Sequence, residues 1–518
     1  MQQMSDVAAP CGTVHGAVVG GVHVFRGIPY ALPPVGELRF APPRPAPRVD
    51  DIDATRFGAI SLQDIDPLPE ALPGTENNFY APGAVTSEDC LNLNVWTADP
   101  SGSAPVYVYI HGGAFVYGSG TGPWIDGARL AREHGIVVVT VNYRLGLLGG
   151  LYLGDTDPQR ANFAIRDQIA ALRWVRENIA AFGGDPDAVT IGGESAGAMS
   201  VLALLVAPDA RGLFHRAVVE SGHADAFVSL DTARASTATV LARLHLDPDA
   251  DDLLARLREV STLRLLAAQR EFGIRVRTFP LVTDDVLIVA DPLASLREGI
   301  AADIDLVIGS TRDEDNLFSV TGWAPPTRPL DRVLGDLLPA GPARDHAREL
   351  YGAVVAEQGL DAAQAEHLVV TDHGWGEPVR TVVRAHAGSG GRTYHYEFAW
   401  ASSVPLVGAA HLVDLPFFMG TLDAPGIPAL LGDETRTDPA TVDLGQRVSA
   451  TLAQFVATGD LAASALGPWP AYETETPRTM IIDRESRVVR DHLADRLDFW
   501  QSQRGVSVTP LSTMASAE

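Results

Sequence analysis

The chain has 518 residues, of which 46% are apolar and 20% charged, a composition typical of a soluble globular protein. Its formal net charge of −26 argues against nucleic acid and anionic membranes as partners. All 39 basic residues are arginine, and the absence of lysine excludes Schiff-base chemistry, P-loop phosphate binding and Ser-x-x-Lys hydrolases.

Neither a signal peptide nor a membrane-spanning segment is predicted from the sequence. The N-terminal residues have neither a basic start nor an apolar core, so no signal peptide is expected, and no apolar run is long enough to span a bilayer. Two cysteines, Cys11 and Cys90, suit a reducing cytoplasm, although a single bridge between them stays open. We expect a cytoplasmic protein, whose oligomeric state the sequence does not indicate.

Strands and helices are predicted to alternate along the chain with short connections. A helical period covers residues 167–182, and runs of apolar, β-branched residues predict buried strands. Such alternation indicates an α/β fold, with a large, mostly parallel sheet covered by helices on both faces. The expected strands lie within residues 21–40, 87–96, 105–110, 136–142, 188–191, 216–220, 303–309, 393–400 and 480–482.

Two longer stretches break this alternation and are mainly helical. They cover about residues 230–296, interrupted near Phe279, and about residues 330–387. Insertions of this kind often cap a substrate site. Because no internal repeat, low-complexity segment or linker is found, we expect one domain over residues 1–518 that carries both insertions.

A G-x-S-x-G motif at residues 193–197 separates a predicted strand from an apolar helix. A serine at a sharp strand-to-helix turn is exposed above the sheet, and flanking glycines permit close backbone approaches that a Cβ would block. The start of the new helix also directs free N–H groups to the space beside the hydroxyl. Ser195 is therefore the candidate nucleophile.

Upstream, the strand at residues 105–110 ends in His111-Gly112-Gly113-Ala114-Phe115. A buried strand followed by two glycines can turn its N–H groups inward to bind an oxyanion. His111 is expected to be a structural member of this loop rather than a base.

A serine nucleophile needs a base and an orienting carboxylate, which follow in the order acid, then histidine, at strand ends in α/β-hydrolases. Glu314 and His411 fit that order and placement. The pattern leaves Asp313 open as the acid. It also leaves other histidines open as the base, namely His223, His373 and His395.

The chain resembles the type-B carboxylesterases, the branch of the α/β-hydrolases that includes cholinesterases and bacterial para-nitrobenzyl esterases. The matching motifs occur in the family's order over almost the whole chain. They lie at residues 25–40 (FRGIPYALPPVGELRF), 87–96 (SEDCLNLNVW), 111–115 (HGGAF), 142–149 (NYRLGLLG), 167–186, 192–200 (GGESAGAMS), 309–314 (GSTRDE) and 408–420 (GAAHLVDLPFFMG).

This resemblance implies a serine carboxylesterase that hydrolyses uncharged aryl or alkyl esters through an acyl-enzyme, without metal or cofactor. It implies a triad of Ser195, His411 as general base and Glu314 as orienting acid. It further implies oxyanion donors at the backbone N–H groups of Gly113, Ala114 and Ala196, with Glu194 and Ser221 supporting the triad.

The sequence departs from the family pattern at three places. The acid is followed by Asp315, where the family usually has glycine, and Ala114 replaces the third glycine of the oxyanion loop. No cysteine lies between Cys11 and Cys90, so the bridge of secreted relatives is not expected, as fits a bacterial intracellular enzyme.

Two other functions stay open. The same machinery hydrolyses carbamates or activated amides, and some relatives of this fold are non-catalytic binding modules. Apolar pocket walls are the weakest prediction, because each candidate is equally suited to the core. The candidates are Phe115, Trp124, Phe279, Phe318, Trp375 and Trp400.

Overall fold

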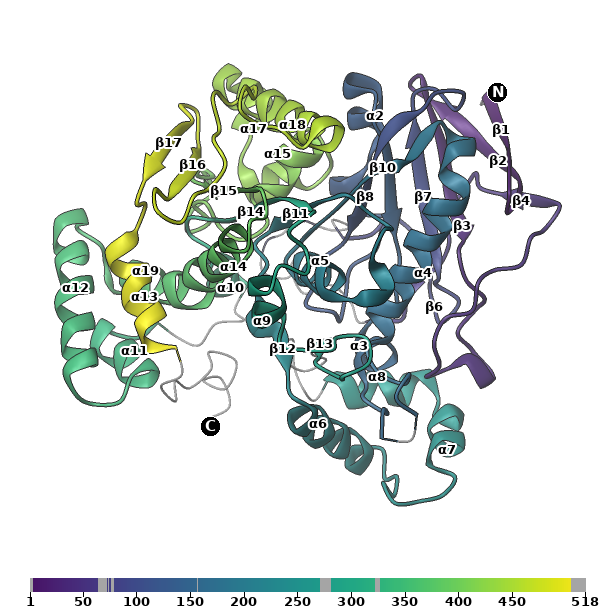
Figure 1. Cartoon of the computed structure of the whole chain (residues 1–518), viewed down its shortest axis with the longest axis horizontal. Coiled ribbons are helices and arrows are strands. Elements are labelled where there is room, and N and C mark those ends of the chain that lie inside the picture. Colours follow the sequence, from purple (N-terminus) through teal and green to yellow (C-terminus); the bar gives the residue numbers. More distant parts are fainter. Residues whose placement is uncertain are drawn as a thin grey trace.

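The computed structural model describes residues 3–63, 72, 74–75, 79–155, 157–270, 281–321 and 327–504. A large twisted sheet runs through its centre (Figure 1). In spatial order its strands are β1 (Gln3–Ala9), β2 (Gly12–Val19), β3 (Val22–Pro29), β7 (Asn92–Thr97), β9 (Val137–Val141), β8 (Ala104–Ile110), β10 (Gly184–Glu194), β11 (Arg216–Glu220), β14 (Asp305–Thr311), β15 (Thr393–Phe398), β16 (Arg478–Ile482) and β17 (Arg487–Arg490), with β4 (Asp51–Asp53) beside β2.

The centre of the sheet is parallel and its edges are antiparallel. Every pairing from β9 through β16 is parallel, whereas β1, β2, β3 and β7 pair antiparallel on one side and β17 does so on the other. The mostly parallel sheet is thus confirmed. The strands β1, β2 and β17, at the two ends of the sheet, were not predicted, because half-exposed hairpin strands lack the continuous apolar runs of the central ones.

Alternate residues of the central strands face two separate apolar layers. In β8, Val106, Val108 and Ile110 pack on one side, and Tyr107 and Tyr109 pack on the other. This period of two, together with the run of apolar residues, is what a strand buried on both faces requires.

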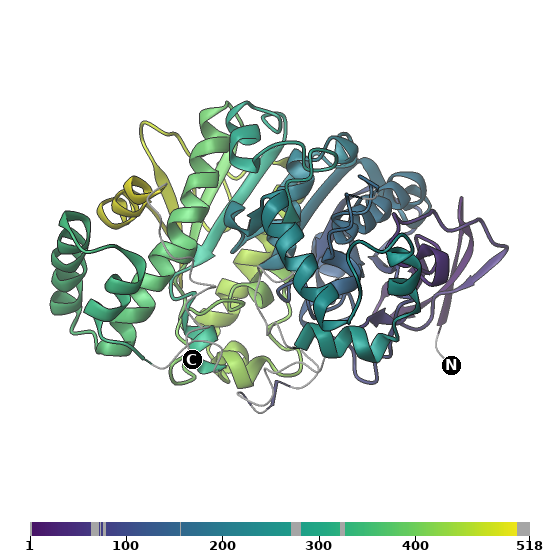
Figure 2. The same cartoon turned by 90° about the horizontal axis from the view of Figure 1, so that it is seen from below.

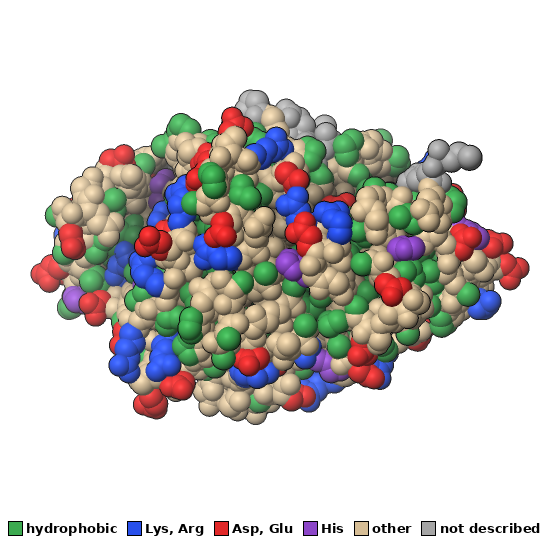
Figure 3. Space-filling model, turned by 90° about the horizontal axis from the view of Figure 1, so that it is seen from above, with side chains coloured by type: hydrophobic (Ala, Val, Ile, Leu, Met, Phe, Trp, Pro, Cys, Tyr) green, Lys and Arg blue, Asp and Glu red, His purple; other side chains and the backbone are tan. Residues whose placement is uncertain are grey.

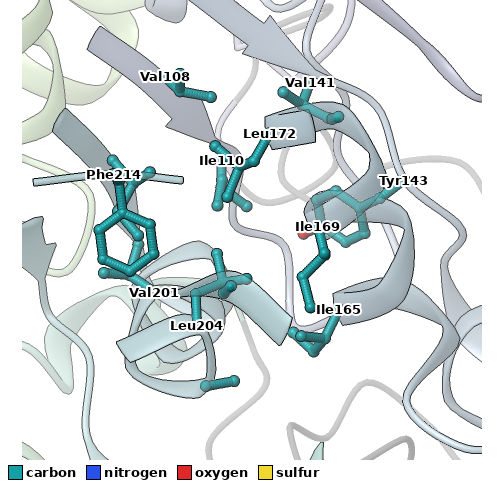
Figure 4. Close-up of a cluster of buried hydrophobic side chains, with 14 of the residues drawn as sticks. Val108, Ile110, Val141, Tyr143, Ile165, Ile169, Leu172, Val201, Leu204 and Phe214 are labelled. Carbon is teal, nitrogen blue, oxygen red and sulfur yellow. The ribbon is translucent and has the colours of Figure 1, made fainter. Parts of the chain in front are cut away.

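Helices cover both layers, as Figures 1 and 2 show. The first layer is covered by α4 (Phe163–Asn178), α5 (Ala196–Val206), α9 (Pro292–Arg297) and α14 (Glu377–Gly388). Figure 4 shows side chains of α4 and α5 meeting those of β8 in this layer. The second is covered by α2 (Ala128–His134), α15 (Leu415–Met419), α16 (Ile427–Leu431) and α18 (Pro439–Thr458).

Both predicted insertions are mainly helical. The first contains α6 (Leu230–Arg243), α7 (Leu253–Glu259) and α8 (Thr262–Arg270), before the short β13 (Leu281–Val282) and α9. The second contains α11 (Leu330–Leu337), α12 (Pro342–Gln358), α13 (Ala362–Thr371) and a π-helical turn (Asp372–Gly376) that continues into α14. Short elements complete the chain, namely β5 (Ile60–Ser61), β6 (Thr86–Ser87), α3 (Gly146–Gly150), β12 (Phe227–Val228), α10 (Asn316–Val320), α17 (Glu434–Thr437) and α19 (Ala494–Gln503).

A partly buried arginine, Arg39, connects the N-terminal loop to the first insertion. Arg39 donates from Nε to Glu88 at 2.7 Å. Its Nη1 donates to the carbonyls of Arg258 and Val260 at 2.7 and 2.6 Å. One guanidinium thereby joins three segments that are far apart in the sequence.

The surface mixes both charge signs, and acidic and basic side chains lie side by side on the face in Figure 3. Cys11 and Cys90 are both free thiols. Within the described ranges, no helix has the length and apolar character needed to cross a membrane. Phe279 lies outside the described residues.

Candidate active site

The G-x-S-x-G motif forms a strained turn between β10 and α5. Ser195 has φ +56° and ψ −122°, a conformation that L-residues rarely adopt. A Cβ on Gly197 would lie 2.0 Å from the carbonyl oxygen of Ile110, and one on Gly193 would lie 2.5 Å from the carbonyl carbon of Gly197. The Ser195 N–H donates to the carbonyl of Glu220 at 2.9 Å. The glycines therefore allow the close packing that holds the serine at this turn.

The loop after β8 passes directly beside this serine. A Cβ on Gly112 would lie 3.2 Å from that of Ser195. Gly113 and Ala114 both have positive φ, +105° and +52°, which turns the backbone sharply. No hydrogen bond within the described part of the chain uses the backbone N–H of Gly113, Ala114 or Ala196. These are three donors of the kind an oxyanion requires.

His111 has a structural position in this loop. Its ring stacks on that of Tyr143 at 4.4 Å, and its Nδ1 lies 2.8 Å from the carbonyl oxygen of Gly112. Burial lowers its pKa to about 4. The imidazole is therefore neutral near pH 7 and is committed to its loop, as the sequence predicted.

Glu314 and His411 meet at the carboxyl edge of the sheet. Glu314 Oε2 lies 2.5 Å from Nδ1 of His411. Its other oxygen, Oε1, accepts hydrogen bonds from the Ser221 hydroxyl and from the Thr311 N–H, the latter at 2.8 Å. Glu314 is completely buried. With both oxygens engaged, the carboxylate has one orientation, which fixes the imidazole ring.

The second nitrogen of His411 faces another carboxylate. Its Nε2 lies 3.0 Å from Oε1 of Glu194, the residue before the candidate nucleophile. Burial lowers the pKa of His411, but the charges of Glu194 and Glu314 outweigh burial and raise that pKa well above its usual value. No hydrogen bond between His411 and Ser195 occurs among the described residues. The imidazole is bracketed by two acids.

Two further buried acids, Glu220 and Asp414, interact electrostatically with Glu194, and the sequence analysis missed both. Burial and the negative charges of Asp414 and Glu194 raise the pKa of Glu220 well above its usual value. Burial and nearby carboxylates raise the pKa of Asp414 to about 7, and the hydroxyl of Tyr396 donates to Asp414 at 3.0 Å. The only sequence signal was the position of Asp414, three residues after His411.

The other candidate histidines are engaged elsewhere. His395 bonds a threonine hydroxyl at 3.0 Å, and burial lowers its pKa to about 3. His373 packs on the ring of Trp500 at 4.5 Å. His223 contacts Trp375 edge to face at 5.2 Å, at the margin of the site. Of the four histidines considered from the sequence, His411 alone meets the carboxylate of Glu314.

Asp313, the rival acid, serves the backbone instead. Its Oδ2 accepts the N–H of Ala409 at 2.9 Å, and Arg312 pairs with it at 2.8 Å. It therefore shapes the loop before His411 without reaching the imidazole. In the part of the chain that the structure describes, no group of three or more His, Cys, Asp or Glu residues is arranged to hold a metal ion.

Of the predicted wall residues, two contact the imidazole. The ring centroids of Trp375 and Phe318 lie 4.6 and 5.4 Å from that of His411. The two aromatic rings are nearly parallel and 5.9 Å apart. Trp375 belongs to the π-helical turn and Phe318 to α10, so the second insertion reaches the site.

The remaining wall candidates have core positions. Trp400 packs on Phe417 at 4.9 Å and donates to a threonine hydroxyl, and Trp124 donates to the carbonyl of Pro425. Phe115 belongs to the apolar layer under α4. A large aromatic side chain after a strand fills the core as readily as it lines a pocket, and the packing of Trp400 is that of a core residue.

Comparison with known proteins places this geometry in a family. The family model for the carboxylesterase family matches residues 3–500. A para-nitrobenzyl esterase of Bacillus subtilis (strain 168) is 36% identical over 496 residues, covering 94% of this chain and 96% of its own. A phenmedipham hydrolase of Pseudarthrobacter oxydans is 34% identical, covering 93% and 95%.

Solved structures agree. A carboxylesterase of Geobacillus stearothermophilus superposes with a TM-score of 0.83 at 35% identity, covering 96% of this chain and all of its own. A para-nitrobenzyl esterase structure has a TM-score of 0.82 at 34% identity, covering 96% and 99%. This chain therefore belongs to the carboxylesterase family and is a carboxylic-ester hydrolase with the α/β-hydrolase fold.

Proposed function

We propose that Ser195, His411 and Glu314 form the catalytic triad of this esterase. The observation that carries the proposal is the 2.5 Å contact between Glu314 and His411, at the sheet edge where Ser195 stands on its strained turn. An acid that orients one imidazole nitrogen leaves the other to exchange a proton with the nucleophile.

Catalysis on this proposal needs one adjustment at His411. Its Nε2 faces Glu194 at 3.0 Å, and the hydroxyl that it must reach belongs to the next residue. Catalytic hydrogen bonds often tighten only when substrate is bound. A small reorientation toward Ser195 would leave the Nδ1 contact with Glu314 in place.

The proposed reaction has two halves. Ser195 Oγ attacks the ester carbonyl carbon as its proton passes to His411 Nε2, and the N–H groups of Gly113, Ala114 and Ala196 bind the oxyanion. The intermediate collapses, the ester C–O bond breaks, and the alcohol leaves with the proton from His411. Water then attacks the acyl group, His411 takes a proton from it, and Ser195 recovers its hydrogen as the acid departs.

The substrates are proposed to be uncharged esters with a flat apolar group. The stacked pair of Phe318 and Trp375 beside His411 offers a surface for such a group. The Bacillus subtilis relative is named a para-nitrobenzyl esterase, which supports an aromatic ester as the first substrate to assay.

The test compares wild-type enzyme with Ser195→Ala on para-nitrophenyl acetate and para-nitrobenzyl esters. We expect turnover to fall by roughly 10⁴-fold or more in the variant, because the nucleophile is lost. Circular dichroism and thermal melting verify that the fold is kept. Turnover that survives in Ser195→Ala would rule out the triad.

Matched carbamate and amide substrates distinguish the alternative activity. An amide has the poorer leaving group and a carbamate the less electrophilic carbonyl, so we expect kcat/KM to be highest for the ester of a series matched in size. A higher value for the carbamate would make this chain a carbamate hydrolase with the same triad.

We also propose that the enzyme works in a bacterial cytoplasm. Two free thiols, one of them completely buried, support a reducing compartment, and the bacterial sources of the two relatives support the rest. Detection of the protein in the periplasmic or secreted fraction of its host would contradict this.

A further inference from the structure

Three consecutive acids follow β14, and each contacts a different part of the molecule. Asp313 accepts the N–H of Ala409, in the loop before His411. Glu314 holds the His411 ring. Asp315 turns away from both and reaches α13, in the second insertion. The first contact shapes the loop before His411 and the second orients the His411 ring, which leaves the third to be explained.

Asp315 makes two hydrogen bonds to α13. Its Oδ2 lies 2.8 Å from Nδ1 of His367, and its backbone N–H donates to the Thr371 hydroxyl at 3.2 Å. Asp315 is 8% exposed, and the His367 side chain 18%. Loss of either partner is costly, because the remaining group would have no hydrogen-bond partner at a place that water reaches only in part.

The Asp315 side chain has no local task that would account for this position. It precedes α10, yet its side chain makes no capping hydrogen bond to that helix. It does not touch the triad, whose acid is already held by Ser221 and Thr311. The side-chain contact with His367 is thus a link between the loop of the triad acid and an element of the insertion.

That element carries the aromatic wall. His367 lies in the second half of α13, which continues into the π-helical turn with Trp375. Trp375 contacts His411 at 4.6 Å and Phe318 at 5.9 Å. Phe318 belongs to α10, directly after Asp315. The hydrogen bond therefore closes a ring of contacts that runs from the triad acid through α13 and Trp375 back to the triad histidine.

We infer that the Asp315–His367 hydrogen bond is a positioning strut that sets the distance between the Trp375 wall and the triad, and so determines selectivity for esters with flat aromatic groups. The inference rests on the proposed function. Other hydrogen bonds hold the triad acid. Loss of the strut therefore changes the space beside the imidazole and not the chemical step.

The test measures kcat and KM for para-nitrophenyl acetate and para-nitrophenyl benzoate. Asp315→Ala and His367→Leu should each lower the benzoate-to-acetate ratio of kcat/KM about tenfold through a higher KM for benzoate, with kcat for acetate within about twofold. The double variant should equal His367→Leu, because either single variant already breaks the Asp315–His367 hydrogen bond, and His367→Leu also removes the 3.4 Å contact of Nδ1 with the Ser319 hydroxyl. Asp315→Asn keeps an acceptor for His367 and should retain the wild-type ratio.

Asp361→Ala is the matched control. Asp361 caps the same helix, α13, through a capping box with Gln364, and it is far along the helix from the strut. This variant loosens α13 without breaking the strut. A ratio that falls equally in Asp361→Ala, or additive effects in the double variant, would overturn the strut and leave only general helix stability.

The two proposals fail in different ways. If Ser195→Ala abolishes turnover while Asp315→Ala keeps the wild-type ratio, the strut is wrong and the triad stands. If Ser195→Ala retains turnover, the proposed function itself is wrong. Melting temperatures of all variants separate a change in selectivity from a loss of folded enzyme.

Discussion

The active site has two halves that are held in different ways. Ser195 follows β10 and Glu314 follows β14, two parallel strands that are separated by β11 and whose backbone register is set by hydrogen bonds. The aromatic wall with Trp375 belongs to the second insertion and is held by helix packing and side-chain contacts, without strand pairing. The sheet half therefore determines the chemistry, and the insertion half determines the shape of the pocket.

This difference follows from the physics of the two supports. A parallel sheet buried on both faces has little freedom, so groups at its carboxyl edge are placed to within the tolerance that catalysis requires. A wall held by packing and a few hydrogen bonds, without the register of a sheet, costs less to move. The residue that links the two halves also departs from the usual family pattern, since Asp315 stands where the family usually has glycine.

The largest expected effect tests the sheet half. Glu314→Gln should reduce kcat by roughly 10³- to 10⁴-fold, because a neutral amide cannot stabilise the imidazolium of His411. The neighbouring variant Asp313→Asn is the control, since Asp313 bonds only backbone and Arg312, and its kcat should stay within about tenfold. Equal losses in both variants would mean that the loop, and not the charge of Glu314, carries the effect.

Alanine variants of Trp400 and Trp375 distinguish a core residue from a residue of the pocket wall. Trp400→Ala should cost about 3 to 5 kcal/mol of unfolding free energy, because it empties a buried site against Phe417. Its kcat/KM per folded molecule should stay near wild type. Trp375→Ala should do the reverse, with a smaller loss of stability and weaker turnover of benzoate. Urea titrations and steady-state kinetics measure both quantities, and an activity defect in Trp400→Ala would return it to the wall.

A buried acid beneath the triad should make stability pH-dependent. The pKa of Asp414 is raised to about 7 in the folded chain, so the folded state holds a proton that the unfolded chain releases near pH 4. Raising the pH from about 4 to 7 therefore destabilises the fold through this group. Asp414→Asn should remove that cost and gain about 1 to 3 kcal/mol relative to wild type at pH 8 but not at pH 4.

Thermal melts of Asp414→Asn and wild type across this pH range measure the difference. A stability difference between the two proteins that does not change with pH would contradict the prediction, because it would show that folding does not raise the pKa of Asp414.

The smallest expected effect concerns the pH profile of the enzyme. The base must be neutral to act, so kcat/KM should rise with pH through the raised pKa of His411. Glu194→Gln removes one of the two charges that raise this pKa, and should move the acidic limb to lower pH by about one unit. Glu220→Gln is the control, because Glu220 does not contact the imidazole. An unmoved limb in Glu194→Gln would show that the 3.0 Å contact with Nε2 does not control the base.

The sequence alone determined the parallel centre of the sheet and the position of Ser195. Strands buried on both faces require continuous apolar runs. The nucleophile turn requires Gly193 and Gly197, because the packing leaves no room for a Cβ at either position. These are local requirements, legible within a few residues. The order of acid and histidine was also predictable, but Asp313 and several histidines stayed equivalent until the family resemblance was applied.

Only the tertiary structure decided which distant groups meet. Glu314 and His411 are 97 residues apart, and no local pattern shows that Nε2 faces Glu194, that Asp414 and Glu220 lie buried nearby, or that Trp375 packs on the imidazole where Trp400 fills the core. Local sequence governs backbone conformation through sterics and burial period, whereas these contacts depend on where separate elements come to lie. Local sequence patterns thus predicted the type of chemistry, whereas the residues around the imidazole could be identified only from tertiary contacts.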